Sequence, residues 1–236
     1  MSDFSVGVDE MRIVFKIGGS VIASPLDAER IVQYSKALRS VKDKGHEVVV
    51  VVGGGKVARE FISIAEGIGL SDNDKDEIAI LVSRLNARLL AGALGKYGSG
   101  NIPSTTEEVS TLLAAGKIAV MGGLRPGITT DTVAAIVLES VKSKFLVKAT
   151  DQEGIYNKDP RKNPDARKID RLTYSDLHKI VSQKAHMPGM HDILDPESIR
   201  ILESQSAKVI VVSGLKPENL LAAVSGAKIG TVVESG

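Results

Sequence analysis

A lysine and a series of glycine-rich turns are the residues of this chain whose types and spacing could do chemistry. Lys16 stands near the end of a β-branched run and is followed by Gly18–Gly19–Ser20. The segments GGGK (53–56), GGLRPGITTD (122–131) and SGLKPE (213–218) follow three further runs of this kind. Such turns expose backbone N–H groups, helix N-termini add partial positive charge, and a lysine offsets the charge that develops as a phosphoryl group moves. The pattern predicts a site for more than one phosphate group.

The segment GGGKVA fits two nucleotide-binding patterns unequally. A P-loop requires G-x-x-x-x-G-K-[ST], but Val50 stands at its first glycine position and Val57 follows the lysine. The dinucleotide pattern G-x-G-x-x-A is matched by Gly53, Gly55 and Ala58, with acidic residues about 20 positions further on. This match keeps a nicotinamide-dependent oxidoreductase open as an alternative. A plain strand-to-helix turn would also account for two of the three glycines.

Six β-branched runs alternate with helical patterns and would position these turns. The runs lack polar residues at alternate positions, which is typical of strands buried on both faces of a parallel sheet. Helices are predicted to start with Ser24–Pro25, to cover 75–94, and to start after Thr130–Asp131 and at Pro217–Glu218. The alternation predicts an open α/β sandwich with a mainly parallel sheet. The predicted strands are RIVFKI (12–17), EVVVVV (47–52), KIAVM (117–121), KFLVKA (144–149), KVIVV (208–212) and GTVVES (230–235).

Composition excludes several classes of protein. The chain has 236 residues, and its 30 basic and 29 acidic residues leave a formal charge of +1, so no overall field would attract nucleic acid or a membrane. The absence of cysteine excludes disulfides and thiolate chemistry and fits a cytoplasmic location. Residues 1–10 lack the regions of a signal peptide, and we expect them to be a disordered extension. No apolar run approaches the ~18 residues of a membrane span.

The motifs also follow one another in a characteristic order: KIGGS (16–20), GGGKVAR (53–59), GGLRPGITTD (122–131), and KATD (148–151) with GIY (154–156) and DP (159–160). In this order and spacing the chain resembles the amino acid kinase superfamily, and most closely its archaeal-type uridylate (UMP) kinases. The resemblance implies a three-layer α/β/α sandwich formed by a single domain over residues 11–236. It also implies transfer of the γ-phosphoryl group of ATP, bound with Mg²⁺, to UMP, giving UDP and ADP in pyrimidine nucleotide biosynthesis. The implied assembly is a cytoplasmic homohexamer, a trimer of dimers, with no nucleic-acid or membrane partner.

The resemblance assigns roles to individual residues. Lys16 would be the catalytic electrophile at the transferring phosphoryl group, and Asp131 would hold its ammonium group in position, although Asp131 could also be a simple helix cap. No residue is assigned as a metal ligand. Asp76 would bind the ribose hydroxyls of UMP. The residues assigned to ATP are Gly19, Ser20, Gly55, Arg59, Thr150, Tyr156 and Asp159; those assigned to UMP are Gly54, Asp76, Leu124, Arg125, Pro126, Gly127, Ile128, Thr129 and Thr130.

Two features depart from other members of the superfamily. Several members place a second catalytic lysine before a late helix, where this chain has HDILDPESIR (191–200). Isopentenyl phosphate kinases are expected to have a histidine after the GGG turn, and this chain has none there. We therefore expect Lys16, Mg²⁺ and the backbone to offset the reacting charge, and we keep Lys148 as a candidate for the phosphate site. His186 and His191 do not share a face and are expected to be loop residues.

Other interpretations remain for the same residues. The acidic segment SDNDKDE (71–77) is not a calcium loop, because Glu77 stands where glycine is required and Ser83 where the bidentate glutamate should be. Another phosphate- or carboxylate-acceptor kinase of the superfamily would share most of the motifs. A nucleotide-binding storage or regulatory protein of the same fold is the third possibility. The presence of Lys16 and Asp131 argues against it, since binding alone would not require them.

Overall fold

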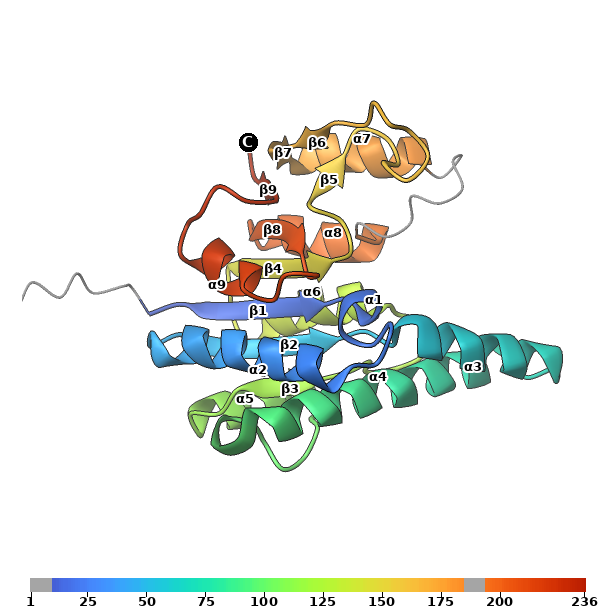
Figure 1. Cartoon of the computed structure of the whole chain (residues 1–236), viewed down its shortest axis with the longest axis vertical. Helices are drawn as coiled ribbons and strands as arrows, with labels where there is room; N and C mark the ends of the chain where they lie inside the picture. Colours follow the sequence, from blue (N-terminus) through green and yellow to red (C-terminus); the bar gives the residue numbers. More distant parts are fainter. Residues whose placement is uncertain (1–9, 185–193) are drawn as a thin grey trace, which may run out of the picture.

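The computed structural model describes residues 10–184 and 194–236. The disorder expected for the first nine residues and the loop expected at His186 and His191 lie outside the described residues. Within them, seven strands form one sheet in the order β3-β2-β1-β4-β8-β9-β7 (Figure 1). The strands are β1 (Arg12–Ile17), β2 (Glu47–Val52), β3 (Ala119–Met121), β4 (Phe145–Thr150), β7 (Arg171–Thr173), β8 (Lys208–Ser213) and β9 (Thr231–Glu234).

The sheet is parallel from β3 to β8, as the uninterrupted apolar runs predict. The last predicted strand differs, because β9 runs antiparallel to β8, and β7 pairs parallel to β9. The helix in the connection is short: α9 (Asn219–Val224) has six residues, which cover only about 9 Å. The chain therefore stays near the carboxyl end of β8 and starts β9 there, with Thr231 opposite Val211.

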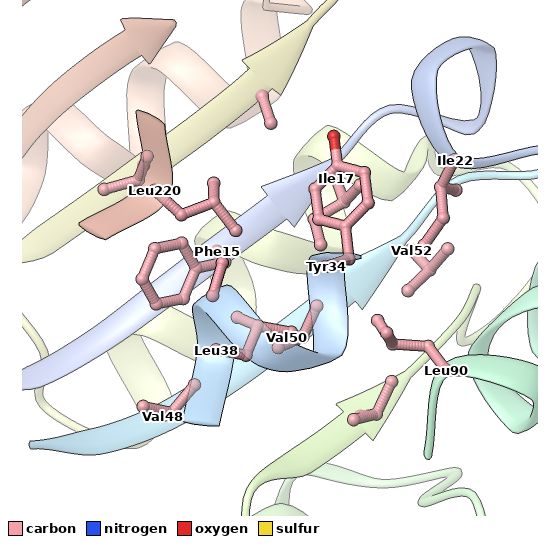
Figure 2. Packing of buried hydrophobic residues seen from close by; sticks show 14 of the residues in the cluster. Phe15, Ile17, Ile22, Tyr34, Leu38, Val48, Val50, Val52, Leu90 and Leu220 are labelled. Atoms are coloured by element: carbon pink, nitrogen blue, oxygen red, sulfur yellow. The ribbon is translucent and has the colours of Figure 1, made fainter. Parts of the chain in front are cut away.

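Two helical layers cover the two faces of the sheet. Along each central strand, alternate side chains enter different cores: Phe15 packs with one layer and Val14 with the other, and both are fully buried. In the first core, Tyr34 and Leu38 of α2 meet Phe15 and Val50 (Figure 2). This two-sided burial explains why the strands show no polar alternation. The first layer is α1 (Gly19–Ile22), α2 (Ala28–Asp43), α4 (Asp72–Leu94) and α9; the second is α5 (Thr106–Ala114), α6 (Thr130–Ser140), α7 (Tyr174–Lys184) and α8 (Pro196–Ser204).

Two predicted helix starts were misplaced. Helix α2 begins at Ala28, with Asp27 as its N-cap, rather than at Ser24–Pro25. The hydroxyl of Ser24 is instead used between turns, donating to Gly19 O and accepting from Lys56 N. Helix α6 is capped by Thr129, whose side chain accepts from two backbone N–H groups, and Asp131 lies inside the first turn. Which residue caps a helix depends on the local backbone conformation. Several neighbouring Ser, Thr and Asp residues are equally suitable caps by residue type.

Helix α4 and α3 (Gly55–Gly67) form an antiparallel pair that projects beyond the carboxyl ends of β1 and β2 (Figure 1). By length and composition alone, Asp72–Tyr97 is the one helical segment of the described residues that could cross a membrane. Its buried side lies in the first core through Leu90 and Leu94. Its buried Ser83 and Asn86 donate or accept hydrogen bonds at glycine turns. We therefore interpret α4 as a core helix of the sandwich.

After β4 the chain forms a small hairpin beside the main sheet. Strands β5 (Ile155–Tyr156) and β6 (Lys168–Ile169) pair antiparallel in a separate two-stranded sheet. The hydroxyl of Thr231 accepts a hydrogen bond from Ile155 N, which attaches the hairpin to β9. The hairpin leaves from the carboxyl end of β4, where the glycine turns also lie.

Candidate active site

A cavity of about 510 Å³ lies at the carboxyl ends of β1, β2 and β4. This is the edge of a doubly wound sheet where ligands bind, beside the strand at which the chain changes direction of winding. Four basic and three acidic side chains line it, among them Lys16, Lys148 and Asp131. The predicted residues that line it are Lys16, Gly19, Ser20, Gly54, Gly55, Arg59, Thr129, Thr130, Asp131 and Thr150.

Lys16 and Lys148 face each other across two neighbouring strands. They are direct partners in the parallel register of β1 and β4 and point to the same face of the sheet. Both are buried, at 7% and 2% exposure, and no other lysine, arginine, aspartate or glutamate of the described residues is buried as deeply. Burying two ammonium groups side by side is costly unless negative charge lies close by. Because the sheet register sets the two ammonium groups side by side, negatively charged groups are needed next to them.

Asp131 meets part of that demand. One carboxylate oxygen lies 3.2 Å from Lys16 Nζ and the other lies 2.7 Å from Lys148 Nζ. Burial alone would raise the pKa of Asp131, but Lys148 and Lys16 outweigh it and hold the pKa below its ordinary value. The ion pair expected between Asp131 and Lys16 is present. Together the three groups carry one net positive charge, which suits a phosphoryl group.

The structure places a second lysine beside Lys16, where the late helix led us to expect none. This lysine is Lys148, on β4, which pairs with the same carboxylate. The sequence contains a signal for this lysine. The segments VFKI (14–17) and LVKA (146–149) each have one lysine near the end of an apolar strand. From the sequence alone Lys148 is only a candidate, because the register that sets it opposite Lys16 is a long-range property.

The first two glycine turns touch each other. A Cβ atom on Gly19 would overlap the backbone of Gly55, and one on Gly53 would lie 2.8 Å from Gly19 N. Gly55 also has φ +69°, a conformation that favours glycine. Asn86 holds the second turn by donating to Gly53 O at 3.0 Å. The glycines thus serve turn packing as well as exposing N–H groups to the cavity.

The third turn carries the loop assigned to UMP. Gly122 and Gly123 let α4 approach, since a Cβ on either would lie within 2.8 Å of Ser83 or Ile80. The Asp76 carboxylate accepts a hydrogen bond from Gly127 N at 2.7 Å, so it lies directly against this loop. The residues that lie outside the cavity lining are Asp76, Leu124, Arg125, Pro126, Gly127 and Ile128. They form a neighbouring surface between α4 and the loop.

The predicted ATP residues of the hairpin also lie outside the lining. Tyr156 is on β5, and the Asp159 carboxylate accepts from Arg161 N in a turn. Arg161 itself lines the cavity and pairs with Asp151. The fourth glycine turn (213–218) is not part of the lining; Leu215 and Lys216 lie against α2 in a separate groove.

Three charged lining residues were missed by sequence reasoning: Asp151, Arg161 and Asp195. Asp195 has a readable local signal, because an aspartate followed by Pro196 is typical of a helix start, and it does cap α8. Nothing local indicated that this cap faces the cavity. Asp151 and Arg161 are ten residues apart in an irregular segment and meet only through the hairpin.

Comparison with known proteins agrees with this architecture. The model of the amino acid kinase family matches residues 11–213, and the chain belongs to that family. Uridylate kinase of Methanocaldococcus jannaschii is 42% identical over 226 residues, covering 95% of this chain and all of the relative. That of Methanobrevibacter smithii is 37% identical over 225 residues, with the same coverage. The crystal structure of uridylate kinase from Archaeoglobus fulgidus superposes with a TM-score of 0.86 at 37% identity, over 94% of this chain and all of the other.

Proposed function

We propose that this protein is a uridylate kinase, which transfers the γ-phosphoryl group of ATP to UMP and releases UDP and ADP. The observation that carries the proposal is the buried cluster of Lys16, Lys148 and Asp131 at the sheet edge where ligands bind. A buried pair of lysines held by one carboxylate suits the charge of a phosphoryl group in transfer. Full-length relatives that bear the name uridylate kinase support the choice of acceptor.

In the proposed mechanism the chain supplies position and electrostatics. Lys16 and Lys148 would contact oxygens of the transferring group from one side, and Asp131 holds both ammonium groups in place. The N–H groups of Gly19 and Gly55 and the hydroxyl of Ser20 would bind the phosphates of ATP, as their place in the cavity lining supports. Arg59 would add a further positive charge at the exposed side. Such transfers require little covalent chemistry from the protein.

The described residues fit Mg²⁺ that arrives with ATP better than a resident metal. They contain no group of three or more His, Cys, Asp or Glu side chains that could hold an ion. Mg²⁺ in kinases is bound by phosphates, water and one or two carboxylates, and Asp151 is a lining carboxylate apart from the lysine cluster. When bound, the ion would neutralise charge on the β- and γ-phosphates.

The two substrates would occupy adjoining surfaces. We place UMP between α4 and the loop 124–130, where Asp76 would exchange its hydrogen bond from Gly127 N for the ribose hydroxyls. Gly54, Thr129 and Thr130 would lie at the boundary with the ATP side. ATP would extend from the glycine turns past Thr150 toward Tyr156 and Asp159 in the hairpin segment.

We further propose a homohexamer, a trimer of dimers, in the cytoplasm, with residues 11–236 acting as one kinase domain. Large apolar side chains stand exposed on the outer faces of α3 and α4 and at the end of α3, which supports contact with another copy: Phe61, Ile64, Ile68, Leu81 and Leu85. The family match from residue 11 and a sheet with strands from 12 to 234 support one domain. The lack of cysteine supports the location.

A substrate panel tests the proposal. Purified protein is given ATP, Mg²⁺ and in turn UMP, CMP, AMP, GMP and small carboxylic acids, and ADP release is measured. We expect UMP to have the highest kcat/KM, since a buried polar mismatch at the base gives strong discrimination. Comparable values for CMP would contradict the acceptor. ADP release only with a carboxylic acid would favour another kinase of the family. Nucleotide binding without ADP release would favour a storage or regulatory protein. Binding of a nicotinamide dinucleotide would support the alternative that the protein is an oxidoreductase.

The assignment of the acceptor surface has its own test. Asp76→Ala should raise the KM for UMP more than the KM for ATP, and should narrow the discrimination against deoxy-UMP. A change confined to the KM for ATP would contradict the placement of α4 beside UMP.

A further inference from the structure

Asp195 joins the starts of two helices that meet at the cavity. Its Oδ2 accepts a hydrogen bond from Thr129 Oγ1 at 2.6 Å, and its Oδ1 accepts from Thr132 Oγ1 at 2.8 Å. The same Oδ1 accepts from Ser198 N at 2.9 Å, which caps α8. One carboxylate therefore ties the first turn of α8 to the first turn of α6.

The hydroxyl of Thr129 is fully used in this network. It donates its proton to Asp195, and it accepts from Asp131 N at 3.1 Å and from Thr132 N at 3.2 Å. A hydroxyl has one proton and two lone pairs, so this one has no proton left for a ligand phosphate. In this structure the hydroxyl of Thr129 is used within the protein, and the assignment of Thr129 to UMP stays a prediction.

A continuous chain of hydrogen bonds then runs from Asp195 to the lysine cluster. The Asp195 carboxylate accepts from the Thr129 hydroxyl, which accepts from the backbone of Asp131. The side chain of Asp131 holds Lys16 and Lys148. We propose that Asp195 is a positioning residue, which fixes the start of α6 and thereby places Asp131 between the two lysines; this rests on the proposed kinase function.

The choice of aspartate supports this role over simple capping. Asparagine caps a helix about as well as aspartate, and it carries no charge that would repel phosphate in the cavity. An asparagine side chain, however, has one acceptor oxygen, and its NH₂ group can only donate. It cannot accept from Ser198 N, Thr132 Oγ1 and Thr129 Oγ1 through two oxygens as Asp195 does. The two oxygens of the aspartate side chain provide acceptors for all three donors.

The substitution Asp195→Asn tests the proposal with a matched control. The new amide would keep the cap of α8 but lose the bond from Thr129. The control is Asp27→Asn, the same change at an exposed cap of α2 that does not line the cavity. We expect Asp195→Asn to lower kcat about tenfold with KM values nearly unchanged, and Asp27→Asn to leave both unchanged. The melting temperature of Asp195→Asn should lie only about 2–4 °C below that of Asp27→Asn, because one hydrogen bond is lost while the fold is kept. Normal turnover in Asp195→Asn would overturn the proposal.

A double-mutant cycle shows whether Asp195 acts through Asp131. If it does, Asp195→Asn added to Asp131→Asn should cause little further loss of kcat, because the position it secures no longer matters. Losses that multiply would overturn the proposal, since they would mean independent roles.

Hydrogen exchange provides a readout that needs no turnover. In Asp195→Asn the amides of Asp131 and Thr132 should exchange faster, while that of Ser198 stays protected. Unchanged exchange at Asp131 would overturn the coupling. If the wild type lacks kinase activity but the exchange pattern appears, the proposed function fails and the helix coupling stands.

Discussion

At the scale of single residues, the site depends on how two like charges are held together. Lys16 and Lys148 are register partners on neighbouring buried strands, and Asp131 bridges their ammonium groups. Removing a lysine makes the net charge of the cluster less positive, whereas removing the carboxylate makes it more positive. Loss of a lysine removes attraction for the phosphoryl group, whereas loss of the carboxylate leaves two buried cations without this partner.

Substituting the lysines separates transition-state contact from substrate binding. We expect Lys16→Ala to lower kcat by about 10²-fold, as for other electrostatic clamps, and Lys148→Ala to lower it by a comparable factor. Steady-state kinetics with UMP and ATP, with circular dichroism as the folding control, provides the measurement. Near-normal kcat in a folded Lys148→Ala would restrict the role to Lys16.

Neutralising Asp131 should affect both activity and stability. Asp131→Asn should lower kcat at least about tenfold, or roughly 1.4 kcal/mol of barrier. Because both lysines lose their bridging carboxylate, the free energy of unfolding at neutral pH should fall by about 3 kcal/mol. This differs from a simple cap, for which asparagine would be nearly neutral. A variant as stable and active as the wild type would contradict the bridging role.

The same carboxylate predicts how stability depends on pH. Its pKa is lowered in the folded protein, so the unfolded chain binds a proton at higher pH than the folded one. Its stabilisation is therefore present above 3.8, the ordinary value, and is lost as pH falls through the lower folded pKa. Denaturant titrations should show the gap between wild type and Asp131→Asn narrowing in that acid range. A gap that stays constant would place the ion pair elsewhere.

At the scale of elements, the glycine turns act as packing devices that bring the helix starts together. The turn after β1 lies against the turn after β2, and Gly122 and Gly123 admit α4 against the end of β3. The turn after β1 is also fixed to β4, since Gly18 N donates to Ala149 O at 2.9 Å. Helix α6 brings Asp131 to the same point from the second layer.

Adding one methyl group at Gly19 tests this packing. Gly19→Ala should destabilise the protein by about 3 kcal/mol, because its Cβ would overlap the backbone of Gly55, which has no flexible end to move away. The matched control is Gly92→Ala on the exposed side of α4, where a Cβ meets nothing within 4 Å. The control should be stabilised by about 0.5–1 kcal/mol. Chemical denaturation of both variants gives the comparison, and equal stabilities would contradict the contact.

At the scale of the whole molecule, the outer surface of α3 and α4 is more apolar than a lone sandwich requires. Ile64 is 61% exposed and Leu85 is 60% exposed, on helices that are otherwise charged outside. The pair also carries Asp76 and extends past the strand ends (Figure 1). Contact with a second copy would therefore cover apolar surface next to the proposed UMP surface.

A charge on this face should break the assembly. Wild type is expected to run as a hexamer in light scattering after gel filtration, and Ile64→Glu with Leu85→Glu should lower the mass. The control Leu215→Glu, 52% exposed beside α9, should leave the mass unchanged. A monomeric wild type, or a control that dissociates equally, would contradict the use of α3 and α4.

The sequence alone determined the strand–helix alternation, the two-sided burial of the strands and the glycine turns at their ends. Each of these features follows from neighbours a few residues apart: alternate valines face opposite cores, and glycine permits a tight turn. Order and spacing of the motifs also sufficed to indicate the family that was later found to match.

Tertiary structure decided which of these residues meet. Lys148 became part of the cluster because β4 pairs with β1 in a register that sets it opposite Lys16. Asp195 was readable as a cap, but its bonds to Thr129 and Thr132 span more than 60 residues. The direction of β9 depended on the short helix α9, after which the chain still lies near the carboxyl end of β8. Such pairings are chosen by the packing of whole layers, because a local pattern specifies how a strand or helix forms and not which neighbour it acquires.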